Sequence, residues 1–167
     1  MRNKRAQQVA LSGLLTSLML VFGFIERQFP LPVPVPGIKL GLANSVLLYA
    51  LYMLGVRRSI VLMLLKALMS WLIYMNMNAM FYSLAGGVFS LAAMILVSRI
   101  SGVSIIGVSA LGAVFFNVGQ PLKAVLMLKT PQLIVYYLPV LMVSGVLTGV
   151  LTGIIAQMVL KHLKHMK

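Results

Sequence analysis

A single carboxylate, that of Glu26, is available to this chain of 167 residues, against fourteen lysine and arginine residues. Catalysis by paired carboxylates needs at least two acidic side chains, and magnesium sites are built mainly from carboxylate oxygens. The sequence has no cysteine for a thiol nucleophile, and no GxxxxGK(S/T) motif for ATP hydrolysis. We therefore expect no enzyme, no metal site and no cofactor, and we look for residues that bind.

Lys66 is the most unusual cation, because it lies in the middle of an apolar run. A charge at the centre of a bilayer costs at least about 2.5 kcal/mol, so this lysine should face the protein interior and have a partner. Ser59, Met63, Ser70 and Tyr74 share its helical stripe. Lys66 is then either the counter-charge for an anionic ligand or the donor of a structural hydrogen bond, and the sequence leaves both open.

Asn117 and Gln120 form a polar pair about one helical turn apart, followed by Pro121. Proline cannot donate to the carbonyl four residues back, so the carbonyl of Asn117 is freed. Such a pair lines either a cavity or a helix contact, and the sequence favours neither.

Lys39 and Asn44 follow a segment, 30–36, in which four prolines alternate with apolar residues. The prolines favour a stiff, extended arm, and the start of the next helix favours anions. Arg27 and Lys123 are expected on the same side of the membrane. Together these residues predict an outward-facing pocket for an anion.

Two stripes of small residues could bring helices close together. Ala6, Ala10, Gly13 and Ser17 recur at helical spacing near the N-terminus and fit either internal packing or a partner helix. The segment 145–153 contains a doubled GxxxG, for which we expect packing inside the bundle rather than a dimer face.

These residues are carried by long apolar runs in a chain that is 61% hydrophobic and 9% charged. A helix needs about 20 apolar residues to cross a bilayer. The sequence predicts an all-α integral membrane protein with a single transmembrane domain, 1–167, and six spans. The expected helices cover about 5–28, 38–54, 57–75, 79–97, 104–128 and 132–163.

The cations predict the orientation, because cytoplasmic loops carry an excess of lysine and arginine. A cytoplasmic N-terminus places nine cations inside and four outside, with Lys66 within the membrane. Those inside are Arg2, Lys4, Arg5, Arg57, Arg58, Arg99, Lys161, Lys164 and Lys167, and those outside are Arg27, Lys39, Lys123 and Lys129. We expect both termini in the cytoplasm, and we assign the surplus charge to orientation rather than to nucleic acid.

Several motifs resemble a bacterial membrane family known both as Gx transporters and as heptaprenyl diphosphate synthase component I. The first motif is the run 35–44, Val-Pro-Gly-Ile-Lys-Leu-Gly-Leu-Ala-Asn, and segments 82–87, 107–120 and 137–141 extend the match. The family often has histidine where Phe116 stands, and it tends to have arginine where Lys66 stands.

That family is similar in size and plan to the S components of energy-coupling factor transporters, which are six-helix vitamin-binding proteins. The resemblance implies a small-molecule substrate. Its pocket would be lined by Lys39, Asn44, Lys66, Asn117 and Gln120, with Arg27 and Lys123 near the pocket mouth.

It also implies multi-pass insertion in the bacterial inner membrane. A coupling membrane protein would dock on Ala6, Ala10 and Gly13, and two separate ATPases would drive import. The alternative is a non-catalytic membrane subunit that anchors a prenyl diphosphate synthase or a redox complex.

Overall fold

The fold is entirely helical in the residues described by the computed structural model, which are 4–28, 41–75, 77–128 and 132–165. At some helix positions, including Arg27 and Lys123, only the backbone is described. The helices are α1 (Lys4–Gln28), α2 (Leu42–Leu54), α3 (Val56–Tyr74), α4 (Met77–Ser98), α5 (Ile105–Leu128) and α6 (Gln132–His165).

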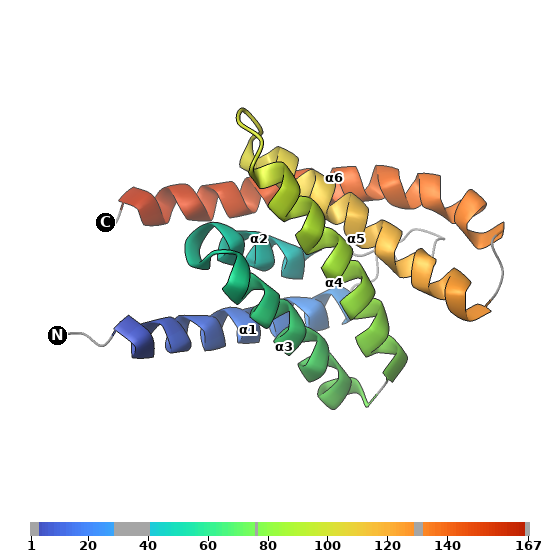
Figure 1. The fold of residues 1–167 in the computed structure, drawn as a ribbon, viewed down its shortest axis with the longest axis horizontal. Helices are drawn as coiled ribbons and strands as arrows, with labels where there is room; N and C mark the ends of the chain where they lie inside the picture. The colour runs from blue at the N-terminus through green and yellow to red at the C-terminus, as the bar shows by residue number, and fades with distance from the viewer. Residues whose placement is uncertain (1–3, 29–40, 76, 129–131, 166–167) are drawn as a thin grey trace.

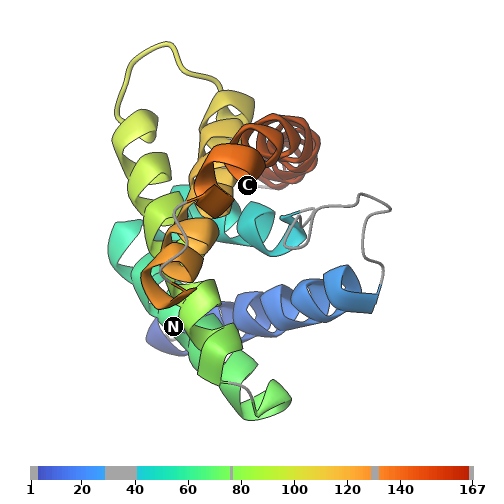
Figure 2. The same cartoon turned by 90° about the vertical axis from the view of Figure 1, so that its right-hand side faces the viewer.

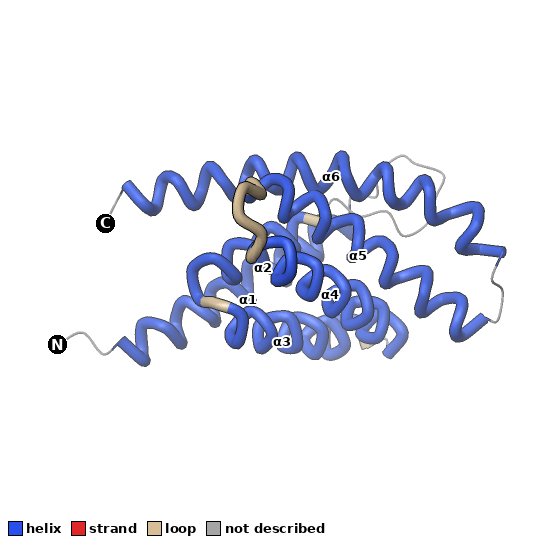
Figure 3. The backbone as a smooth tube through the Cα atoms, turned by 45° about the horizontal axis from the view of Figure 1, so that its top comes forward, coloured by secondary structure: helices blue, strands red, loops and turns tan. Residues whose placement is uncertain are grey.

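The helices run back and forth along one axis, so that the first turn of α1 and the last turns of α6 lie at the same end (Figure 1). The junction of α2 with α3 faces that end, whereas the junction of α3 with α4 lies at the other (Figures 1 and 3). In the end view, α1 and α6 lie on opposite sides of the bundle (Figure 2). The short helix α2 contacts both of them. This arrangement is the one expected for an even number of membrane crossings.

The observed helix ends agree with the predicted ones to within a few residues, with one correction at the start of α2. The sequence predicted a helix from residue 38, but Gly41 has φ 75°, in the left-handed region, and α2 begins at Leu42. A right-handed helix cannot continue through that conformation, which glycine adopts at little cost. Residues 38–40 lie outside the described part of the chain.

Two apolar clusters hold the bundle together. One joins α1 to α2, α3 and α4, with Met19, Leu47 and Leu62 at its centre. The other joins α2, α4, α5 and α6 and consists of Leu48, Leu51, Met94, Val108 and Ala156. We call this second cluster the apolar plug. It lies in the half of the bundle where α2 ends and α5 begins.

Helices α5 and α6 approach each other closely along the glycine repeat of α6. A Cβ atom added to Gly149 would lie 2.6 Å from the Cα atom of Ala110, and one added to Gly153 would lie 2.8 Å from the Cβ atom of Ser109. The hydroxyl groups of Ser109 and Thr152 are 3.2 Å apart across this contact. The prediction that the repeat packs inside the bundle is confirmed.

Three helices in the described part are long and apolar enough to cross a membrane, judged by length and composition: Gln8–Glu26, Met80–Ser98 and Leu138–His162. Leu42–Leu54 and Ile105–Gln120 are shorter apolar helices. At 1.5 Å per residue, α2 with its 13 residues is about 20 Å long, less than the ~30 Å of a hydrocarbon core. In a bilayer, α2 would therefore leave part of the hydrocarbon core unspanned.

Candidate functional site

Among the described residues, the buried polar side chains that lack a hydrogen-bond partner lie on one side of the apolar plug. Asn44 lies one helical turn before Leu48 on α2, and Ser90 lies one turn before Met94 on α4. Both steps lead away from the end of the bundle that carries the termini (Figure 1). The plug therefore separates that end from a polar layer in the other half of the bundle.

Asn44 is the most informative residue of this layer. Its side chain is 4% exposed, and neither its amide nitrogen nor its amide oxygen has a hydrogen-bond partner in the structure. A buried polar group without a partner costs about 1–3 kcal/mol. Residues that carry such a cost need an explanation, such as an ordered water, a bound ion or a functional role.

Two further side chains share this property. Ser90 is 0% exposed with an unpartnered hydroxyl, and Gln120 is 9% exposed with an unpartnered amide nitrogen. The sequence singled out Asn44 and Gln120 but missed Ser90. A lone serine in an apolar helix carries no signal in the sequence, because such serines commonly bond to a carbonyl one turn back, as Ser59 does to Gly55.

Asn117 is used differently from Gln120. Its side-chain nitrogen donates a 3.0 Å hydrogen bond to the carbonyl oxygen of Leu141 on α6, and the residue is 3% exposed. Of the two interpretations that the sequence left open, a helix contact describes this nitrogen. The two residues therefore have different roles. Asn117 joins α5 to α6, whereas the amide nitrogen of Gln120 has no hydrogen-bond partner.

Lys66 faces the interior of the bundle, as its position in an apolar run predicted. It is half-buried, and its Nζ atom lies 5.6 Å from the centre of the Phe116 ring. A cation over an aromatic face gains about 0.5–2 kcal/mol. Phe116 reaches this place because Gly86 of α4 leaves room for its ring, and a Cβ at Gly86 would come within 2.9 Å of it.

At the start of α2, three backbone N–H groups are bonded within the protein. The backbone N–H of Leu42 donates to Oε1 of Glu26, the only carboxylate side chain in the chain. The N–H groups of Asn44 and Ser45 are bonded to the carbonyl of Gly41. Glu26 therefore takes the position at the helix N-terminus that favours negative charge, and it ties the end of α1 to α2.

The remaining predicted pocket residues cannot be placed by their side chains. Lys39 lies outside the described residues, and for Arg27 and Lys123 only the backbone is described. A cationic pocket mouth made by these three residues stays a prediction. In the part of the chain that the structure describes, no group of three histidine, cysteine or acidic side chains could hold a metal ion.

The predicted partner-binding stripe of α1 faces away from the bundle. Ala6, Ala10 and Gly13 are exposed, and a Cβ added to Gly13 would meet nothing within 4 Å. Leu15 and Met19, on the opposite face of the helix, are buried in the core. The alternative that this stripe packs inside the bundle is therefore wrong.

The apolar composition and the long apolar helices are those of a helical membrane protein, and a few buried polar side chains lie within its apolar core. The chain belongs to the heptaprenyl diphosphate synthase component I family, whose model matches residues 15–159. This match confirms the resemblance drawn from the sequence motifs. Comparisons with curated proteins and with solved structures found no match to this chain.

Proposed function

We propose that this protein is the substrate-capture component of an energy-coupling factor-type importer in the bacterial inner membrane. It binds a small, anionic molecule from the outer face and carries out no catalysis itself. A coupling membrane protein and two ATPases supply the energy for import. The observation that carries this proposal is Asn44, a buried amide with both polar atoms unpartnered above the apolar plug.

The polar layer supports a binding pocket for two reasons. First, unpartnered buried amides stay costly unless a ligand satisfies them, and Asn44 and Gln120 are both of this kind. Second, α2 is too short to span a bilayer, and short helices that begin inside the membrane commonly mark binding sites in transporters. The amides would provide hydrogen bonds to the ligand, and Lys66 would provide its counter-charge.

Lys39, Arg27 and Lys123 would surround the mouth of this pocket and attract anions from outside. Asn117 would support its wall through the bond to Leu141. Glu26 occupies the first N–H of α2, so the negative group of the ligand should meet Lys66 rather than that helix end.

The exposed small face of α1 supports docking on a coupling protein. Small side chains let a partner helix approach closely, which favours association within a bilayer. Ala6, Ala10 and Gly13 provide such a surface without disturbing the buried face around Leu15 and Met19. Ligand capture and coupling would then use different faces of the protein.

The test is an affinity purification of the tagged protein in mild detergent, followed by mass spectrometry of the proteins that accompany it. We expect a coupling membrane protein and two ATPases. An Ala10→Trp variant should lose these partners and still retain its small-molecule ligand, because Ala10 is exposed and lies sixteen positions before Glu26, the α1 residue that contacts the start of α2. Wild-type protein purified without any ATPase would contradict the importer proposal.

A second candidate is favoured by the family name, which describes one component of a heptaprenyl diphosphate synthase. In that case the chain would be a non-catalytic membrane subunit that anchors a prenyl synthase. The same purification separates the two candidates, since an anchor would bring a soluble synthase with it, and its buried amides would hold no ligand.

A further inference from the structure

Two arginines stand together where α3 begins. Arg57 is exposed, and the half-buried guanidinium of Arg58 donates to the side-chain oxygen of Gln8 on α1. This bond fixes the position of one guanidinium group against α1. It does not neutralise the charge, because the amide of Gln8 is neutral.

The chain itself has no carboxylate side chain to offer this pair. Glu26 is its only acidic residue, and it is bonded to the N–H of Leu42. Glu26 lies 18 positions beyond Gln8 on the same helix, about 27 Å away at 1.5 Å per residue. Within the described residues, no carboxylate side chain is therefore placed to pair with Arg57 and Arg58, and an anion from outside the protein could do so.

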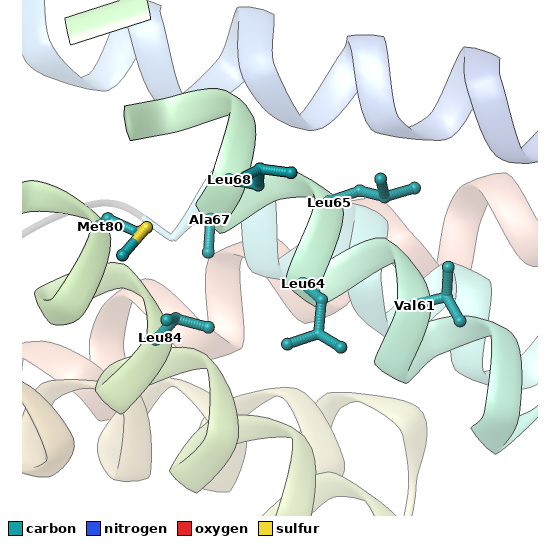
Figure 4. Close-up of a pocket in the computed structure, with 7 residues that line it drawn as sticks. All are labelled: Val61, Leu64, Leu65, Ala67, Leu68, Met80 and Leu84. Atoms are coloured by element: carbon teal, nitrogen blue, oxygen red, sulfur yellow. The ribbon is translucent and has the colours of Figure 1, made fainter. Parts of the chain in front are cut away.

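An apolar groove of about 370 Å³ begins one helical turn from this pair, on the side of the bundle between α3 and α4. It is lined by Val61, Leu64 and Leu68 of α3 on one side and by Met80 and Leu84 of α4 on the other (Figure 4). Its walls are hydrocarbon side chains and a thioether. This volume lies within the range of about 300–1,000 Å³ that is typical of small-molecule sites.

The groove and the arginine pair meet at Val61. This residue lines the groove, and it also lines a second depression between α1 and α3 that contains Arg58 and Gln8. Val61 lies about one helical turn beyond Arg57, roughly 6 Å along α3. A molecule with an anionic head and an apolar tail could therefore contact both features at once.

We propose that this surface binds one anionic phospholipid, with its phosphate on Arg57 and Arg58 and an acyl chain in the groove between α3 and α4. Guanidinium groups bind phosphate through paired hydrogen bonds, and basic sites at a membrane surface favour anionic lipids. The all-apolar groove favours a lipid over a soluble phosphate compound. The proposal does not depend on what the polar layer binds.

The test is native mass spectrometry of the purified protein, mixed with equal amounts of phosphatidylglycerol and phosphatidylcholine that have identical acyl chains. We expect the wild type to retain phosphatidylglycerol roughly tenfold better. Arg57→Gln should reduce this preference several-fold. Arg99→Gln, which removes an exposed cation from the turn after α4, should leave the preference unchanged.

A second pair of variants tests the groove. Val61→Trp should lower the retention of both lipids by filling the groove, whereas Leu151→Trp, at an exposed position on α6, should not. Equal retention of the two lipids by the wild type, or an equal effect of Arg57→Gln and Arg99→Gln, would overturn the proposal. Displacement of the lipid by 10 mM inorganic phosphate would also overturn it, because the site would then recognise phosphate alone.

Discussion

At the scale of single residues, two buried asparagines should respond in opposite ways to the same substitution. Asn44→Leu removes two unpartnered polar atoms, so it should leave thermal stability unchanged or raised, because burying apolar atoms of similar shape costs little. Asn117→Leu breaks the bond to Leu141 and should lower the free energy of unfolding by about 1–3 kcal/mol. Thermal unfolding of the purified variants in detergent measures both effects.

The same Asn44→Leu variant should lose its small-molecule ligand, assayed by mass spectrometry of what is released on denaturation. Natural proteins keep destabilising polar groups mainly where function requires them. A less stable Asn44→Leu variant would show instead that the amide makes a structural contact. The main evidence that the polar layer binds a ligand would then be lost.

Lys66 gives a second prediction at this scale. Lys66→Met keeps the approximate length of the side chain but removes the charge and its attraction to the Phe116 ring, so we expect expression to be intact with at most a modest loss of stability. We expect ligand retention to be abolished if Lys66 is the counter-charge for the ligand. Lys66→Arg, which preserves the charge, is the matched control and should retain at least part of the binding. Normal binding by Lys66→Met would make the lysine structural.

At the scale of elements, the contact between α5 and α6 depends on backbone approach. Gly149→Ala places a Cβ atom 2.6 Å from the Cα atom of Ala110, and backbone atoms cannot move aside as a flexible side chain can. We expect the substitution to destabilise the protein by about 1–3 kcal/mol. Gly13→Ala, where the added atom meets nothing within 4 Å, should be neutral or slightly stabilising. Equal unfolding midpoints for the two variants would contradict the close α5–α6 packing.

The sequence predicted the helices well because their signals are local. Apolar runs end at glycine, proline or charged residues, and these set the helix ends within a few residues. The contacts between helices are not local. The ring of Phe116 reaches Lys66 only because Gly86 of a third helix leaves space. The bond from Leu42 to Glu26 joins residues sixteen positions apart, and no periodicity within either helix indicates it.

At the scale of the whole molecule, the candidate site follows from the direction in which helices run. Asn44 and Ser90 come before their plug residues on two helices that run the same way, which places both amide and hydroxyl on the same side of the plug (Figure 1). The sequence identified Asn44 by its place beside Lys39 at the start of a helix and in the motif of residues 35–44. It could not identify the layer, because the layer exists only once α2 and α4 are packed side by side.

The orientation of the molecule gives the last prediction. The first turn of α1 and the end of α6 lie at the same end of the bundle (Figure 1), and the cations favour that end in the cytoplasm. Because the chain has no cysteine, single-cysteine variants can report which side each turn faces. Ser101, in the turn after α4, is exposed, and Met77, at the start of α4, is 53% exposed.

A membrane-impermeant maleimide should label Met77→Cys in intact cells, and it should label Ser101→Cys only after the cells are permeabilised. The reverse pattern would invert the orientation and place the polar layer toward the cytoplasm. Capture from outside would then be impossible, since the apolar plug would separate the amides from the outer face. Labelling of both variants in intact cells would mean that α4 does not cross the membrane, and the polar layer could not then be a pocket within a bilayer.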